Sequence, residues 1–245
     1  MPCPPPATRP PSPRAPAIEA AEGLDLEALP LFRGVSRSAA KFLLDHGRIR
    51  RHQNNQSLFR QGGAPQYLYI VLDGLVVLSV DEPGGRRQIL EFCGEGELLD
   101  LASVIEGAPH MVSAVTARSA RTFRIQAQAI QDAIARYPSM AVIMSAILAR
   151  HLRETSEKVQ ELKLQSVSQR LAAYLVTLAK RTGANETVLP IEKRLLAARL
   201  GTSAESLSRA FARLRALGVR TVGQTIEIAD LVALQKFSSA STRLC

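Results

Sequence analysis

The chain contains 245 residues, enough for one large domain or two modest ones, and no apolar run in it is long enough to cross a lipid bilayer. Its 31 lysines and arginines outnumber its 22 acidic residues and give a formal net charge of +9, which favours a polyanionic partner. The cysteines, Cys3, Cys93 and Cys245, are too few and too scattered for a disulfide framework or an iron–sulfur cluster. We therefore expect a protein of the reducing cytoplasm with no membrane partner.

Residues 1–25 are expected to form a disordered, proline-rich arm. Eight prolines lie between positions 2 and 16, and proline offers no backbone donor to a helix or a sheet.

Residues 26–135 are expected to form a β jelly roll. Residues 35–47 predict a short helix that ends at Gly47. From about residue 55 to residue 126 the apolar residues come in short runs between turn residues, as where residues 67–72 precede Asp73-Gly74. Many short strands at close spacing are typical of an antiparallel sandwich or jelly roll.

Residues 136–164 predict one long helix that joins two copies of the chain. Apolar positions recur along it at spacings of three and four, and the rest of its surface is charged. Such a narrow stripe is typical of a two-stranded coiled coil, although it is also compatible with packing on the preceding domain. The expected dimer seam comprises Met140, Ile143, Ile147, His151, Leu152, Thr155, Val159 and Leu162.

Residues 165–238 predict a winged helix-turn-helix domain, followed by a tail over residues 239–245. A short helix breaks at Gly201, and a second helix follows with an expected capping box between Thr202 and Glu205. Two short strands around Gly223 then predict a wing. The tight turn, the capped second helix and the wing together indicate binding to double-stranded DNA.

The second helix is expected to place polar side chains opposite its apolar side. Leu207 and Phe211 point inward at helical spacing, which leaves Glu205, Ser208 and Arg209 on the other side. Arg can chelate guanine, Glu can accept from cytosine, and Ser can serve either strand, whereas other arginines would contact phosphates. The full set of expected DNA-binding residues is Thr202, Ser203, Glu205, Ser208, Arg209, Arg213, Arg215 and Gly223. No catalytic constellation is recognisable, so we do not expect an enzyme.

The chain resembles the CRP/FNR superfamily of bacterial transcription regulators over about residues 30–237. The segments Phe59-Arg60-Gln61-Gly62 and 67–74 resemble the family's jelly-roll signature, and Glu205-x-x-Ser208-Arg209 is the FNR-type reading pattern. The resemblance implies an α+β fold: an N-terminal cyclic-nucleotide-binding-like jelly roll, a long dimerisation helix and a C-terminal winged helix-turn-helix. It also implies a homodimeric activator that contacts RNA polymerase and reads an FNR-like box, TTGAT-N4-ATCAA, one half-site per helix.

The resemblance does not fix which small molecule acts as the effector, and several candidates are compatible with it. A cyclic nucleotide is disfavoured, because the arginine due about ten residues after Gly96-Glu97-Leu98 is missing from residues 108–112. Residues 168–179 most resemble the DNR/NnrR subgroup, which implies that haem senses nitric oxide to control denitrification, with His110 as the candidate ligand. The alternative is a DNA-binding protein that needs no ligand and whose jelly roll serves only dimer or protein contacts.

Overall fold

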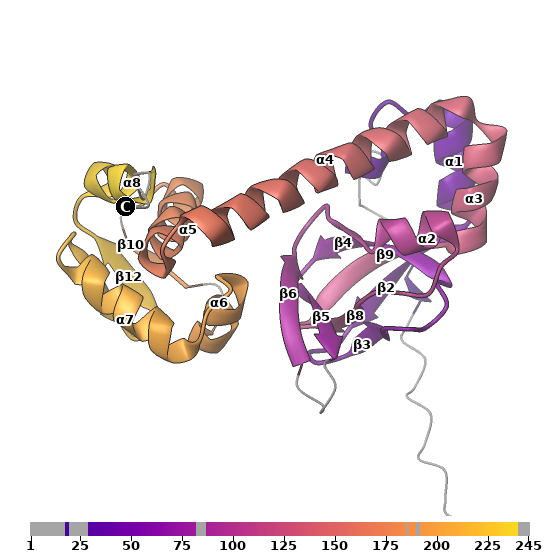
Figure 1. The fold of residues 1–245 in the computed structure, drawn as a ribbon. Helices are drawn as coiled ribbons and strands as arrows, with labels where there is room; N and C mark the ends of the chain where they lie inside the picture. The colour runs from indigo at the N-terminus through magenta and orange to yellow at the C-terminus, as the bar shows by residue number, and fades with distance from the viewer. Residues whose placement is uncertain (1–17, 20–28, 82–86, 185, 190–191, 240–245) are drawn as a thin grey trace, which may run out of the picture.

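The computed structural model describes residues 18–19, 29–81, 87–184, 186–189 and 192–239. A sandwich of strands and a smaller helical domain lie at the two ends of one long helix, α4 (Pro138–Leu164), as Figure 1 shows. Most of the expected arm, and the tail after residue 239, fall outside the described residues. One part of the arm was predicted wrongly, because β1 (Ile18–Glu19) is a strand that pairs with residues 49 and 50.

The N-terminal domain, which we call the sensor domain after the role that the resemblance implies, consists of two antiparallel sheets, which confirms the jelly-roll prediction. The five-stranded sheet has the order β1-β2-β9-β4-β7 and the four-stranded sheet the order β3-β8-β5-β6. The strands after β1 are β2 (Gly47–His52), β3 (Ser57–Phe59), β4 (Tyr67–Asp73), β5 (Val76–Asp81), β6 (Arg87–Cys93), β7 (Leu98–Leu99), β8 (Ser113–Thr116) and β9 (Ala120–Gln126).

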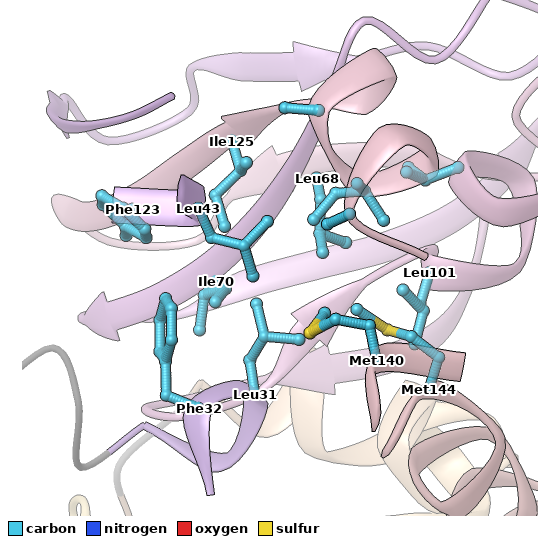
Figure 2. Close-up of a cluster of buried hydrophobic side chains, with 14 of the residues drawn as sticks. Leu31, Phe32, Leu43, Leu68, Ile70, Leu101, Phe123, Ile125, Met140 and Met144 are labelled. Atoms are coloured by element: carbon cyan, nitrogen blue, oxygen red, sulfur yellow. The ribbon is translucent and has the colours of Figure 1, made fainter. Parts of the chain in front are cut away.

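Short helices cover the outer face of the five-stranded sheet. They are η2 (Pro30–Phe32), α1 (Arg37–Asp45), α2 (Leu101–Glu106) and α3 (Ala127–Arg136). Together with the sheet they enclose a core in which Leu31, Leu43 and Ile70 are fully buried (Figure 2). Burying such apolar side chains is the main stabilising contribution to the domain.

The sequence predicted that the first helix ends at Gly47. In the structure α1 stops earlier, at Asp45, with His46 as its C-cap. Gly47 is instead the first residue of β2. A Cβ at this position would lie 1.9 Å from the ring of Phe123, so the glycine is required by the close approach of this ring.

Helix α4 has two halves with different surroundings. Met140 is fully buried and Met144 is 2% exposed, and both point into the sensor core (Figure 2). The assignment of Met140 to a dimer seam was therefore wrong, because its side chain fills the core of its own domain. From residue 151 to residue 164 every side chain of α4 is exposed. Among the described helices none alone is long and apolar enough to span a bilayer, although α3 and α4 pass that test together as a pair bent by 119°.

The C-terminal domain packs helices on a small sheet with the order β10-β12-β11. Its elements are α5 (Val167–Thr182), β10 (Glu186–Val188), α6 (Lys193–Arg199), α7 (Ala204–Arg215), β11 (Val219–Val222), β12 (Thr225–Ile228) and α8 (Leu231–Ser239). Its core includes Leu171, Leu196 and Leu214, all fully buried. Helix-turn-helix and wing are thus both present.

The two domains also touch each other directly. The side chains of Val77 and Phe92 in the four-stranded sheet belong to the same apolar cluster as the core of the C-terminal domain. The Arg199 guanidinium of α6 lies 5.7 Å from the centroid of the Phe92 ring, and Lys158 of α4 forms an ion pair with Glu91. The sensor is therefore in physical contact with the first helix of the helix-turn-helix.

Candidate nucleic-acid interface and sensor interior

Helix α7 begins one residue later than the sequence predicted. Its N-cap is Ser203, whose side-chain oxygen accepts a hydrogen bond of 3.2 Å from the backbone N–H of Ser206. The expected capping box between Thr202 and Glu205 is therefore wrong, because Ser203 occupies the cap position. Among the described residues, no hydrogen bond engages the carboxylate of Glu205, which is exposed in the first turn.

The two sides of α7 differ as the helical spacing predicts. Leu207 is 2% exposed and Phe211 is 8% exposed, so one side belongs to the domain core. Ser208 and Arg209 are exposed on the other side, together with Glu205. A terminal nitrogen of Arg209 donates a hydrogen bond of 3.0 Å to the hydroxyl of Ser206, which holds the guanidinium close to the helix surface. The three polar side chains thus share one accessible surface.

The turn between α6 and α7 is fixed by its backbone and its neighbours. Gly201 has a φ of +60°, a conformation that other residues adopt at a cost. Arg170 of α5 donates a hydrogen bond of 3.0 Å from Nε to the carbonyl of Leu200, which satisfies a carbonyl at the end of α6. A Cβ at Gly201 would lie 2.7 Å from a methyl group of Leu162, so the end of α4 packs on the turn. The orientation of α7 is therefore linked to α4.

The flanking basic residues lie in different settings. The Arg213 guanidinium is 5.9 Å from the centroid of the Phe237 ring in α8, so part of its freedom is lost to a cation–π contact. Arg215 and Arg220 are exposed, the latter on β11. Gly223 has a φ of +62° at the tip of the wing. Sequence reasoning did not anticipate the contact of Arg213 with α8, because α8 follows α7 only after the wing.

The exposed half of α4 carries the remaining residues of the expected seam. Leu152 is 68% exposed, Leu162 51% and Val159 46%. Ile143 and Ile147 are half-buried, and Ile147 packs on the sensor core. The apolar stripe therefore changes from a core contact to a solvent-exposed row along one helix.

His110 is held inside the sensor by Asp100 and Phe59. Its Nδ1 lies 2.7 Å from a carboxylate oxygen of Asp100, and its ring stacks on Phe59 with the centroids 3.9 Å apart. The residue is 3% exposed. A haem on this histidine would need the space that the Phe59 ring and the packed interior occupy. The surroundings of His110 therefore do not fit a haem.

A pocket of about 450 Å³ lies near the junction of β9 and α3, where it is lined in part by Tyr67, Gln126 and Gln131. His110 is not among its lining residues. Within the described residues, no group of three or more His, Cys, Asp or Glu side chains could hold a metal ion.

The sequence did not reveal that basic side chains of β2 face the inside of the sandwich. Arg50 and His52 of β2 are 9% and 8% exposed. Their signal was the strand alternation around Ile49, which places Arg50 and His52 on the face opposite Ile49. That face becomes an interior only when the second sheet covers it, which one strand cannot indicate.

Comparisons with known protein families match both domains. Residues 49–137 match a family described as a cyclic nucleotide-binding domain, and residues 169–237 match a Crp-like helix-turn-helix domain. The cyclic AMP receptor protein of Thermus thermophilus is 29% identical over 214 residues, which cover 87% of this chain and 98% of the relative. A CRP-like cAMP-activated global transcriptional regulator of Mycobacterium tuberculosis is 27% identical, covering 82% of this chain and 92% of its own length.

Solved structures with the same arrangement also exist. The structure of a putative cAMP-binding regulatory protein from Silicibacter pomeroyi is 30% identical in sequence and superposes with a TM-score of 0.63. The match covers 86% of this chain and 94% of the chain in that structure. The structure of FixK2 from Bradyrhizobium japonicum is 21% identical with a TM-score of 0.69, covering 79% of this chain and 98% of its own. The latter supports the fold alone.

Proposed function

Because the chain belongs to the CRP/FNR family of transcription regulators, we propose that it binds DNA as a homodimer, with α7 of each copy in the major groove of one half-site. The relatives are transcription regulators and not enzymes. The observation that carries the proposal is the exposed row of Glu205, Ser208 and Arg209 on a helix whose opposite side is buried.

Within this proposal, base edges are read by the exposed row of α7. Arg209 chelates a guanine and Glu205 accepts from a cytosine, since both side chains project from the first turns of the helix. Phosphates are contacted by Thr202, Ser203, Arg213 and Arg215, and by the wing at Gly223. The operator we propose is the FNR-like box TTGAT-N4-ATCAA.

The homodimer would form along the exposed half of α4. Leu152, Val159 and Leu162 leave apolar surface in water within one chain, and a second copy would remove that surface from water. The seam then comprises Ile143, Ile147, His151, Leu152, Thr155, Val159 and Leu162, without Met140. Since Leu162 packs on the turn before α7, the geometry of the seam would set the spacing of the two reading helices.

A small effector in the sensor would favour one dimer geometry over the other, and only one geometry would match the operator. Such a regulator would act in the cytoplasm and activate transcription through RNA polymerase. Nitric oxide sensing through haem, and a role in denitrification, remain predictions that rest on resemblance to the DNR/NnrR subgroup. The packed surroundings of His110 do not support haem binding at this residue.

The test of DNA binding uses the full chain and fluorescence anisotropy. A labelled TTGAT-N4-ATCAA duplex should bind at least about a thousandfold more tightly than a duplex with scrambled half-sites, and the complex should contain two chains. Equal affinity for both duplexes, or a monomeric complex, would contradict the proposal. An absorption spectrum after incubation with haem, with and without nitric oxide, tests the effector separately. A featureless spectrum would exclude haem as the cofactor and would leave the conclusion on DNA binding unchanged.

A further inference from the structure

The inner face of the five-stranded sheet carries basic side chains. Successive residues of a strand point to opposite faces, so the burial of Ile49 and Phe123 under the helices turns Arg50 and Arg124 the other way. Arg124 lies next to Tyr69 in the strand register, and Tyr69 belongs to the cluster between the two sheets. The basic side chains therefore face the interior of the sandwich.

Three basic groups lie close together on this face. Arg50 is 9% exposed and pairs in register with Thr122, whose hydroxyl lies 2.9 Å from Nε2 of His52. Arg124 is half-buried, and its guanidinium lies 4.2 Å from the centroid of the Tyr67 ring. Two guanidinium groups and an imidazole thus share one wall of the interior.

Among the described residues, Nε of Arg124 and Nδ1 of His52 on this wall are buried and find no hydrogen-bond partner. Within the described part of the chain Arg124 also takes part in no ion pair. Asp100, which follows strand β7 at the edge of the same sheet, is already hydrogen-bonded to His110. A buried polar atom without a hydrogen-bond partner costs free energy, so a partner for these two atoms would be stabilising.

The charges of the arginines act on their neighbours in the same sense. Burial, followed by the charges of Arg124 and Arg50, lowers the pKa of His52 to about 4. Burial raises the pKa of Tyr69, whereas the charge of Arg124, a side-chain hydrogen bond with Arg124 and the charge of Arg50 oppose that rise. Both effects indicate a positive potential at the wall.

We propose that Arg50, Arg124 and His52 form a binding site for a small oxyanion, a phosphate or carboxylate group, and that this anion is the effector of the sensor. An anion would accept hydrogen bonds from Nε of Arg124 and, in the tautomer with its proton on Nδ1, from His52. The assignment as effector rests on the proposed function. The path along the chain from this site to the dimerisation helix is short. Strand β9, which carries Arg124, ends at Gln126, α3 begins at the next residue, and α4 follows α3.

Binding is tested first on the unaltered protein in the absence of DNA. Thermal unfolding and isothermal titration would be measured with inorganic phosphate and with succinate, each against sodium chloride at equal ionic strength. At about a hundredfold excess over Kd, an anion that binds only the folded chain should raise Tm by about 5–10 °C. The two probes distinguish a phosphate ligand from a carboxylate ligand.

Variants on one strand then locate the site. Arg124→Gln should abolish the saturable shift, and Arg50→Gln should weaken it at least tenfold in Kd. The matched control is Arg121→Gln, which removes the same charge from β9 but on the outer face, where Arg121 lies 3.9 Å from Asp73. The control should keep the wild-type response.

A second readout does not depend on the variants being folded. In the wild type, an anion beside His52 should raise the imidazole pKa above its value without ligand, which histidine NMR signals report directly. No saturable response to either probe, or a loss in Arg121→Gln equal to that in Arg124→Gln, would overturn the inference. A dimer that reads its operator but does not respond to either anion would overturn it and leave the proposed function intact.

Discussion

The reading helix and the inner wall of the sensor arrange their polar residues in opposite ways. Helix α7 presents Glu205 and Arg209 to water, whereas the five-stranded sheet turns Arg124 and His52 into the sandwich. A solvated charge costs little when it has no partner, but a buried one is costly. The reading surface is therefore stable without DNA, whereas the buried Nε of Arg124 and Nδ1 of His52 would be stabilised by the proposed anion.

The largest expected effect tests the division of α4 into a buried and an exposed half. Met140→Ala should lower the free energy of unfolding by about 2–5 kcal/mol, because it leaves a cavity in the sensor core. Urea unfolding at fixed protein concentration measures this change. Sedimentation should show that folded Met140→Ala has the same dimer dissociation constant as the wild type.

Leu152→Ala is the matched variant on the exposed half of the same helix. It should weaken the dimer and leave the core of the sensor intact, since Leu152 is 68% exposed within one chain. If Met140→Ala weakened association as much as Leu152→Ala, the core assignment of Met140 would be contradicted.

The next effect sharpens the contrast through pH. His52 has a folded pKa of about 4 against an ordinary value of 6.5, so the unfolded chain takes up a proton first as the pH falls. The stability that His52 contributes is complete above pH 6.5 and is lost between pH 6.5 and about 4. The expected loss is about 3 kcal/mol.

Urea unfolding at a series of pH values, for the wild type and His52→Gln, isolates this contribution. The variant should lose less stability than the wild type over that window. Identical slopes for both proteins would mean that His52 is not buried in a positive environment.

The fold and the reading helix were largely predictable, because their signals are local. Glu205, Ser208 and Arg209 follow from helical spacing around Leu207 and Phe211, and no distant residue is needed to place them. The exact cap was missed by one residue, since Thr202 and Ser203 both have side chains that can cap a helix.

The interior of the sensor was not predictable in the same way. Asp100 and His110 meet across a loop and a helix, and Arg50 faces Thr122 through a pairing of strands about 70 positions apart. Met140 was misplaced for a related reason. A helical stripe shows which residues share a side, but not which partner covers each part of it.

The third effect separates base reading from phosphate contact on the DNA-binding surface. Arg209→Ala should cost about 1–3 kcal/mol on the specific duplex and relax the preference at one base pair. Arg215→Ala should weaken binding to all sequences alike and reduce the salt dependence by about one ion. Anisotropy titrations on specific and scrambled duplexes at two salt concentrations measure both. An equal loss on both duplexes for Arg209→Ala would assign Arg209 to a phosphate.

The smallest effect concerns the start of the reading helix, where sequence and structure disagree by one residue. Ser203→Ala should lower the free energy of unfolding by about 0.5–2 kcal/mol, because the backbone N–H of Ser206 loses its acceptor. Thr202→Ala is the matched variant and should have a smaller effect, since Thr202 is not the cap. Ser203→Ala should also free Arg209 to move, because Ser206, which accepts from Arg209, is hydrogen-bonded to Ser203 as well. A larger loss of stability in Thr202→Ala than in Ser203→Ala would support the capping box that the sequence suggested. In that case the Glu205 carboxylate would accept a hydrogen bond from the backbone of Thr202 and would not be available to a base.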